Sequence, residues 1–261
     1  MCVSTLRRIF YCEISSLKLK FVIFEMVMKI AGLQKVSTID YPGKISCIIF
    51  LYGCNFRCGF CYNPGLVTKE FDGGYTEDEV LDFLKKRKGK LDAVCITGGD
   101  PLISLEKSFV EKIKDLGYLV KVDTNGSFPE RLKELIDSKL VDYIAMDIKG
   151  SSDRYTEIAG VNVDLKKIEK SIKLINDFGS GEFRTTILER FHDEAEVEKM
   201  GKWLSKVCDG IPRKIFLQGF RNDLGKMIDG DFEKDKNTSE KYLMKLKGIL
   251  DNYFGEVEVR M

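Results

Sequence analysis

Three cysteines stand within eight residues of one another. Cys54, Cys58 and Cys61 occur in the stretch GCNFRCGFCYNP (53–64) of a chain that has eight cysteines among 261 residues. Thiolates at this C-x3-C-x2-C spacing can converge on one metal centre. A structural zinc site takes four ligands in a closed tetrahedron, commonly as two C-x2-C pairs. The motif therefore indicates a centre with three protein ligands and one open position.

No fourth ligand stands near this motif. Cys47 and Cys95 lie inside apolar runs, where a free cysteine is usually a small core residue. The single histidine, His192, stands at the start of a predicted helix and is expected to be an exposed polar residue. Cysteine thiolates also hold iron–sulfur clusters, normally four to a cluster. Three would leave one iron open to a substrate or cofactor. The other cysteines are scattered: Cys2, Cys12 and Cys208.

Further polar residues follow apolar runs at points where a strand would stop. GGD (98–100) ends one run, VDTNG (122–126) a second and MDIKG (146–150) a third, while FRTTIL (183–188) carries Arg184 within a fourth. The carboxyl ends of parallel strands meet at one edge of a sheet, which is where α/β barrels place their active sites. We therefore expect these residues to gather around one site.

The cysteine motif, with aromatic Phe60 just before the last cysteine, resembles that of the radical S-adenosylmethionine (SAM) superfamily. This resemblance implies that Cys54, Cys58 and Cys61 bind one 4Fe-4S cluster. The amino and carboxylate groups of SAM would chelate the open iron, and one electron would cleave SAM to methionine and a 5′-deoxyadenosyl radical. Phe60 is carried over with the motif as a cofactor contact.

The same resemblance assigns the strand ends to SAM. Gly98 and Gly99 match two glycines of the family's GGEP segment, whose acid helps to receive the SAM amino group. Asp100 departs from that pattern, because aspartate is one methylene shorter than glutamate and the contact would need a backbone shift or a bridging water. The remaining expected SAM contacts are Asp123, Asp147, Lys149 and Arg184, and the two aspartates could also hold a monovalent cation.

Within the superfamily, the stretch from Met28 to Met261 resembles the activases of glycyl radical enzymes. The opening GLQKVSTIDYPGK (32–44) is similar to the activating proteins of anaerobic ribonucleoside-triphosphate reductase. Such an activase takes a hydrogen atom from a glycine of its partner and receives its electron from a flavodoxin- or ferredoxin-type donor. Residues 62–94 contain no cysteine, so the resemblance implies one cluster.

Two other functions stay open at this point. A radical SAM enzyme acting on a small molecule, such as a 7-carboxy-7-deazaguanine synthase, has the same compact core. A zinc-binding interaction module would be the non-enzymatic reading of the cysteines. For Arg184 the alternative role is a surface salt bridge, and for Asp123 and Asp147 it is exposed charge in strand-terminal turns.

The elements that position these residues alternate between strand and helix. Six short apolar runs read as buried strands and six intervening segments have helical spacing, the first with a capping box formed by Thr76 and Glu79. Six such units predict an α/β fold, a partial (βα)6 TIM-like barrel with a radical SAM core. The strands are expected at 45–52, 93–99, 119–126, 143–150, 183–188 and 214–220, and the helices at 76–89, 104–117, 129–138, 164–179, 194–207 and 239–255.

Composition places the chain among ordinary globular proteins. Lys and Arg number 42 against 41 Asp and Glu, and hydrophobic residues make up 44%. This balance gives no electrostatic reason to expect nucleic acid or a membrane as a partner. Clustered cysteines without a disulfide pattern favour a cytoplasmic location. We expect residues 1–27 to be a mis-assigned or disordered extension, and residues 28–261 to form the radical SAM domain.

Overall fold

The computed structural model describes residues 28–68 and 73–261. The extension expected at residues 1–27 lies outside the described residues. Within them, no helix has the length and apolar character that crossing a membrane requires.

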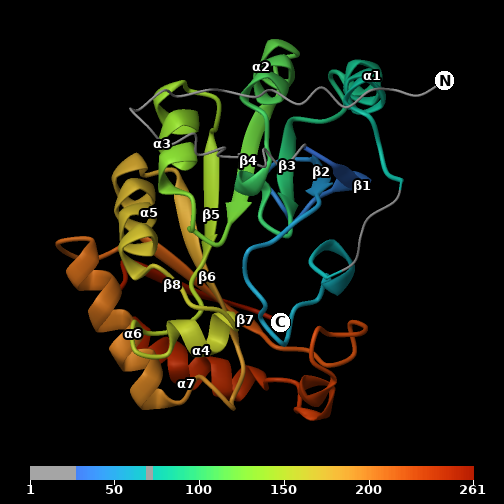
Figure 1. Ribbon diagram of the computed structural model, residues 1–261. Helices are drawn as coiled ribbons and strands as arrows, with labels where there is room; N and C mark the ends of the chain where they lie inside the picture. The colour runs from blue at the N-terminus through green and yellow to red at the C-terminus, as the bar shows by residue number, and fades with distance from the viewer. Residues whose placement is uncertain (1–27, 69–72) are drawn as a thin grey trace, which may run out of the picture.

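One curved sheet of eight strands organises the described chain (Figure 1). Its strands lie side by side in chain order from β1 to β8. The first pair is antiparallel, and every later pair is parallel. β1 and β8 form the two edges, so the barrel is open. The bounds are β1 Ile30–Ser37, β2 Ser46–Leu51, β3 Ala93–Gly98, β4 Leu119–Thr124, β5 Tyr143–Asp147, β6 Gly181–Ile187, β7 Lys214–Gly219 and β8 Glu256–Arg260.

Helices cover the outer face of this sheet (Figure 1). The six predicted helices are confirmed, α6 with the predicted bounds and the other five with shorter ones, and a short α4 is added between β5 and β6. Three turns of 3-10 helix, η1 Pro64–Leu66, η2 Pro101–Ile103 and η3 Gly230–Lys234, lie in the loops. The α-helices are α1 Glu77–Arg87, α2 Lys107–Asp115, α3 Pro129–Asp137, α4 Tyr155–Ala159, α5 Leu165–Phe178, α6 Glu194–Val207 and α7 Glu240–Leu250.

The six predicted strands correspond to β2–β7, which confirms the partial α/β barrel. β1 and β8 are two edge strands that the search for apolar runs missed. Their sequences, IAGLQKVS and EVEVR, mix charged and apolar residues because an edge strand is only partly covered. Charged side chains on an edge also hinder pairing with other chains.

The two faces of the sheet differ in chemistry. The outward side chains pack on the helices in one large apolar core, in which Cys47, Val94 and Ile96 are fully buried. The inward face has a small apolar cluster that includes Cys95, followed by charged side chains such as Lys121 and Glu182. Cys47 and Cys95 are therefore core residues, as predicted. β4 and β6 are not apolar throughout, because their inner positions carry charged side chains.

The capping box predicted from Thr76 and Glu79 is present at the start of α1. The Thr76 hydroxyl accepts from Glu79 N at 3.2 Å, and the Glu79 carboxylate accepts from Thr76 N at 2.8 Å. Thr76→Ala removes one of these bonds and should lower the free energy of unfolding by about 1 kcal/mol. Thr76→Ser retains the hydroxyl and should stay near wild type. Urea denaturation measures both, and an equal loss in the two variants would contradict the assignment.

Candidate active site

A cavity of about 490 Å³ opens at the carboxyl ends of the parallel strands. Its walls come from the loop after β2, the ends of β3, β4 and β5, and residues of β6, β7 and β8. Ten of the eleven predicted site residues line it, which brings together segments more than 120 positions apart in sequence. They are Cys54, Cys58, Phe60, Cys61, Gly98, Gly99, Asp123, Asp147, Lys149 and Arg184.

The cysteine loop is fastened through its backbone. Gly53 N donates to Leu66 O, Arg57 N to Ala159 O, and Asp229 N to Gly59 O, each at 2.9–3.0 Å. A Cβ on Gly59 would lie 2.3 Å from the ring of Phe232. The loop is therefore held from three separate segments, and a side chain at position 59 would displace the segment around η3.

Phe60 is buried within an aromatic cluster as well as lining the cavity. Its ring centroid lies 6.3 Å from that of Phe191 and 5.9 Å from that of Phe232. These rings come from the β6–α6 connection and from η3.

Burial favours the protonated form of two of the three thiols. It raises the pKa of Cys54 to about 12 and also raises the pKa of Cys58. A thiolate at either position therefore needs positive charge beside it, which a bound metal centre would supply. Two N–H groups already point at Cys54 Sγ, Phe56 N at 3.4 Å and Asn125 Nδ2 at 3.9 Å. Such donors are among the groups that tune iron–sulfur clusters.

The three thiols line one cavity without closing around a point. Among residues 28–68 and 73–261, no group of three or more His, Cys, Asp or Glu side chains could hold a single metal ion. The donor set, three cysteines and no histidine, suits a cluster with several irons, because each thiolate then binds a different iron. The residues present thus fit a 4Fe-4S group.

Two glycines let the end of β3 pass against β2 and the cysteine loop. Gly98 has φ of +132°, and a Cβ there would lie 2.0 Å from Leu51 O. A Cβ on Gly99 would lie 2.1 Å from Gly53 O and 2.9 Å from Cys54 Cβ. Any larger residue at either position would separate the GGD turn from the cysteine loop.

Asp100 lies behind this turn instead of in the cavity. Its side chain is fully buried and accepts from Leu102 N at 2.9 Å, Thr124 Oγ1 at 2.9 Å and Asn125 N at 2.6 Å. Burial raises its pKa to about 6, although these donors favour the ionised form. Asp100 therefore joins the end of β3 to the end of β4. A direct contact with the SAM amino group stays a prediction.

A chain of alternating charges crosses the inner face of the sheet. Lys121 Nζ lies 2.5 Å from Asp123 Oδ1, and Arg184 bridges Asp123 Oδ2 at 3.2 Å and Asp147 Oδ1 at 3.0 Å. Lys149 Nζ follows, 3.5 Å from Asp147 Oδ2. Three cations thus meet two carboxylates. This surplus of positive charge beside the cavity suits a ligand with a carboxylate.

The directions of the pKa shifts indicate that Asp123, Asp147 and Lys149 are all ionised. Burial would raise the pKa values of Asp123 and Asp147, but the cations beside them together outweigh it and lower both, Arg184 with Lys121 for Asp123 and Arg184 with Lys149 for Asp147. Burial would lower the pKa of Lys149, but Asp147 and the other acidic groups around it together raise it. The Arg184 side chain is 14% exposed, so the alternative of a surface salt bridge is wrong for this residue. Asp123 is equally shielded and is not an exposed turn residue.

Sequence reasoning missed Lys121 and misplaced His192. Lys121 is 2% exposed, and a lysine in the middle of the apolar run LVKVDT was the available signal. His192 was expected to be exposed, but it is completely buried between the β6–α6 connection and the end of β5. Its ring nitrogens bond to Leu188 N at 3.2 Å and Lys149 O at 2.9 Å.

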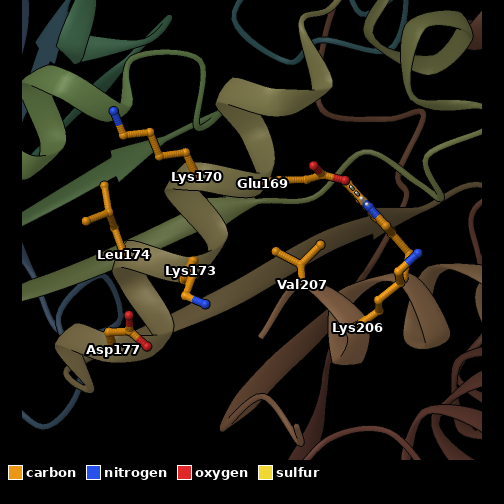
Figure 2. Close-up of a pocket in the computed structure, with 8 residues that line it drawn as sticks. Glu169, Lys170, Lys173, Leu174, Asp177, Lys206 and Val207 are labelled. Atoms are coloured by element: carbon orange, nitrogen blue, oxygen red, sulfur yellow. Dashed lines mark hydrogen bonds between the residues drawn. The ribbon is translucent and has the colours of Figure 1, made fainter. Parts of the chain in front are cut away.

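A second cavity, of about 580 Å³, lies on the outer face between α5 and α6 (Figure 2). It contains no predicted site residue. Lys170 pairs with Glu130 and Lys173 with Asp209, while Glu169 accepts from Trp203 Nε1. The labelled lysines point in different directions in Figure 2. These mixed charges give it no common ligand chemistry, so the first cavity is the candidate active site.

Comparison with known proteins identifies the family to which the chain belongs. Residues 48–204 match the family model described as the Radical SAM superfamily. A Methanocaldococcus jannaschii protein named as a glycyl-radical enzyme activating enzyme is 36% identical over 243 residues, which is 88% of this chain and 95% of the relative. A second protein of that organism with the same description is 30% identical over 86% of this chain and 88% of its own length. The chain belongs to the radical SAM superfamily and, within it, to the glycyl-radical enzyme activating enzymes.

Solved structures support the fold. The structure of anSMEcpe with bound AdoMet has a TM-score of 0.56 at 18% identity and covers 80% of this chain and 61% of its own. Coproporphyrinogen III oxidase from Escherichia coli has a TM-score of 0.54 at 13% identity, covering 82% of this chain and 54% of its own. Membership of the superfamily implies a 4Fe-4S cluster and SAM as cofactors.

The buried histidine predicts a specific acid sensitivity. Burial lowers the pKa of His192 from 6.5 to about 4, so the unfolded chain binds more protons between these values. The stability that the neutral ring provides is complete above pH 6.5 and is lost as the pH falls towards 4, by roughly 3 kcal/mol in all. Urea unfolding of the apoprotein from pH 7 to 4 should show this loss relative to His192→Gln. Parallel curves for the two proteins would contradict the prediction.

Proposed function

We propose that Cys54, Cys58 and Cys61 hold one 4Fe-4S cluster and that the chain activates a partner enzyme by removing a hydrogen atom from one of its glycines. One observation carries the proposal: the three thiols and the positively charged side chains of Lys149 and Arg184 line the same cavity. A bound cluster with SAM supplies the one-electron cleavage of SAM to methionine and a 5′-deoxyadenosyl radical, the species that takes the hydrogen atom.

The residues of the chain would bind and orient SAM. Lys149 and Arg184 offer positive charge for its carboxylate, and Gly98 and Gly99 leave backbone accessible at the cavity wall. Asp123 and Asp147 keep Arg184 in place and offer carboxylate oxygens to a monovalent cation. Because these groups are already paired with one another, binding requires little reorganisation, and fixed charges of this kind stabilise a ligand more than mobile ones do.

Anaerobic ribonucleoside-triphosphate reductase is the partner that we propose. The support is the opening segment 32–44 together with the DTNG, DIK and FRTT motifs, which resemble those of its activating proteins.

A Staphylococcus aureus relative, 31% identical over 145 residues, is named pyruvate formate-lyase-activating enzyme, and the match covers 49% of this chain and 56% of the relative. A flavodoxin- or ferredoxin-type protein would supply the electron.

The proposal is tested by following the hydrogen atom. The reconstituted protein would be mixed anaerobically with SAM, a reductant and a candidate reductase whose glycines carry deuterium at Cα. We expect deuterium in 5′-deoxyadenosine and a glycyl radical signal in electron paramagnetic resonance. A reductase variant with the radical-site glycine changed to alanine should give neither. Deuterium-free 5′-deoxyadenosine with no glycyl signal would contradict activation of this partner.

The cysteines divide into two functional groups. Alanine at Cys54, Cys58 or Cys61 should abolish cluster binding and SAM cleavage, because each supplies one ligand. Alanine at Cys47 or Cys95 should leave iron content unchanged and lower stability by about 1–3 kcal/mol, as expected when a small core side chain is truncated. Iron analysis and 5′-deoxyadenosine formation measure the difference. Equal loss of iron in all five variants would overturn the ligand assignment.

A further inference from the structure

The chain's single histidine has no part in the site described so far, although it is buried beside it. The Leu188 N–H donates to His192 Nδ1 at 3.2 Å, so this nitrogen carries no proton in the neutral ring. Nε2 therefore carries the proton and donates to the Lys149 carbonyl at 2.9 Å. Both polar atoms of the ring are thus used, and one of them holds the backbone of a proposed SAM-binding residue.

His192 is itself held firmly. The backbone N–H of His192 donates to Leu188 O at 2.8 Å, and its backbone carbonyl accepts from Tyr242 Oη at 3.0 Å. Leu188 and His192 thus bond to each other twice, once through the ring and once through the backbone. The imidazole is therefore a fixed donor and does not follow Lys149 if that residue moves.

The segment that carries Lys149, residues 147–151, is held by hydrogen bonds to other segments at nearly every residue. Asp147 O accepts from Tyr155 Oη at 3.4 Å, and Ile148 N donates to Arg184 O at 2.7 Å. Beyond Lys149, the Glu196 carboxylate accepts from Ser151 N at 2.6 Å and Ser151 Oγ at 2.9 Å.

Close packing also restrains this segment. A Cβ on Gly150 would lie 2.6 Å from Ile158 Cδ1, 2.9 Å from Glu196 Oε1 and 4.0 Å from His192 Nε2. The backbone between Lys149 and Ser151 therefore lies against α4, α6 and the His192 ring. Packing and the hydrogen bond from His192 both hold this backbone in place.

We propose that His192 is a positioning residue for SAM, because its Nε2–H holds the Lys149 carbonyl and thereby places the ammonium group beside Asp147 at the cavity wall. This inference rests on the SAM site proposed above. A lysine has a long flexible side chain, so its ammonium is directed only when its backbone and its carboxylate partner are both fixed. The SAM carboxylate would then meet a charge that is already in place.

Two substitutions separate positioning from simple packing. His192→Gln retains an N–H that can reach the Lys149 carbonyl, whereas His192→Leu has similar bulk and no donor. Both remove the ring nitrogen that faces Leu188 N, so both should lower the melting temperature. We expect His192→Leu to weaken SAM binding about tenfold, the effect of losing one buried hydrogen bond. His192→Gln should stay within about threefold of wild type, because it keeps the donor.

The measurement is the equilibrium dissociation constant for SAM on the oxidised, cluster-loaded protein, without reductant, so that no turnover occurs. Iron content and the cluster absorbance confirm that each variant carries its cluster. Lys149→Met provides the second arm of a double-mutant cycle. In that background His192→Leu should have no further effect on SAM affinity, since the group it positions is gone.

The outcomes distinguish a failure of this inference from a failure of the proposed SAM site. If Lys149→Met leaves SAM affinity unchanged, the SAM site is wrong. If Lys149→Met weakens binding but His192→Leu does not, the site stands and the positioning role is wrong. An equal weakening by His192→Leu with and without Lys149 would also overturn the inference, because His192 would then act by another route.

Discussion

The ion chain from Lys121 to Lys149 is the constraint on which the site depends. Removing charged groups from water is expensive, and a buried pair that loses one partner becomes strongly destabilising. Arg184 connects Asp123 on β4 to Asp147 on β5, so three neighbouring strands must keep their register for the chain to stay paired. The parallel sheet provides this register, and the open side of the barrel leaves Asp147 and Lys149 facing the cavity.

The cysteine loop is positioned by the same edge of the sheet. Close backbone packing holds it there, whereas the ion chain is held by charge. Gly98 and Gly99 allow β3 to contact β2 and the loop, and Asp100 fastens that turn to Thr124 and Asn125. The thiols and the ions therefore share one rigid frame. Radical chemistry needs such a frame, since the protein's task is to place and shield a reactive cofactor.

Much of this arrangement was predictable because its signals are local. The C-x3-C-x2-C spacing, the capping box at Thr76 and the six apolar runs each depend on neighbouring residues. The family model confirms the superfamily that the spacing indicates, and the structure confirms the capping box and the six strands. The ends of parallel strands then gather by topology. This is why Asp123, Asp147 and Lys149 could be expected at one site from the sequence alone.

The parts that were missed depend on contacts between distant segments. The burial of His192 follows from packing between the β6–α6 connection and the end of β5, 43 positions away. Asp100 is turned from the cavity by donors on β4, which its own GGD context does not reveal. β1 and β8 lack an apolar run because they are edges, and an edge is defined only once the neighbouring strands are in place.

We propose that three cysteines hold an iron–sulfur cluster with one iron free for SAM. Electron paramagnetic resonance of the anaerobically reconstituted, reduced protein, recorded with and without SAM, tests it most directly. We expect a reduced 4Fe-4S signal that changes when SAM is added. A protein that binds zinc and gives no cluster signal, or a cluster signal that SAM leaves unaltered, would contradict it.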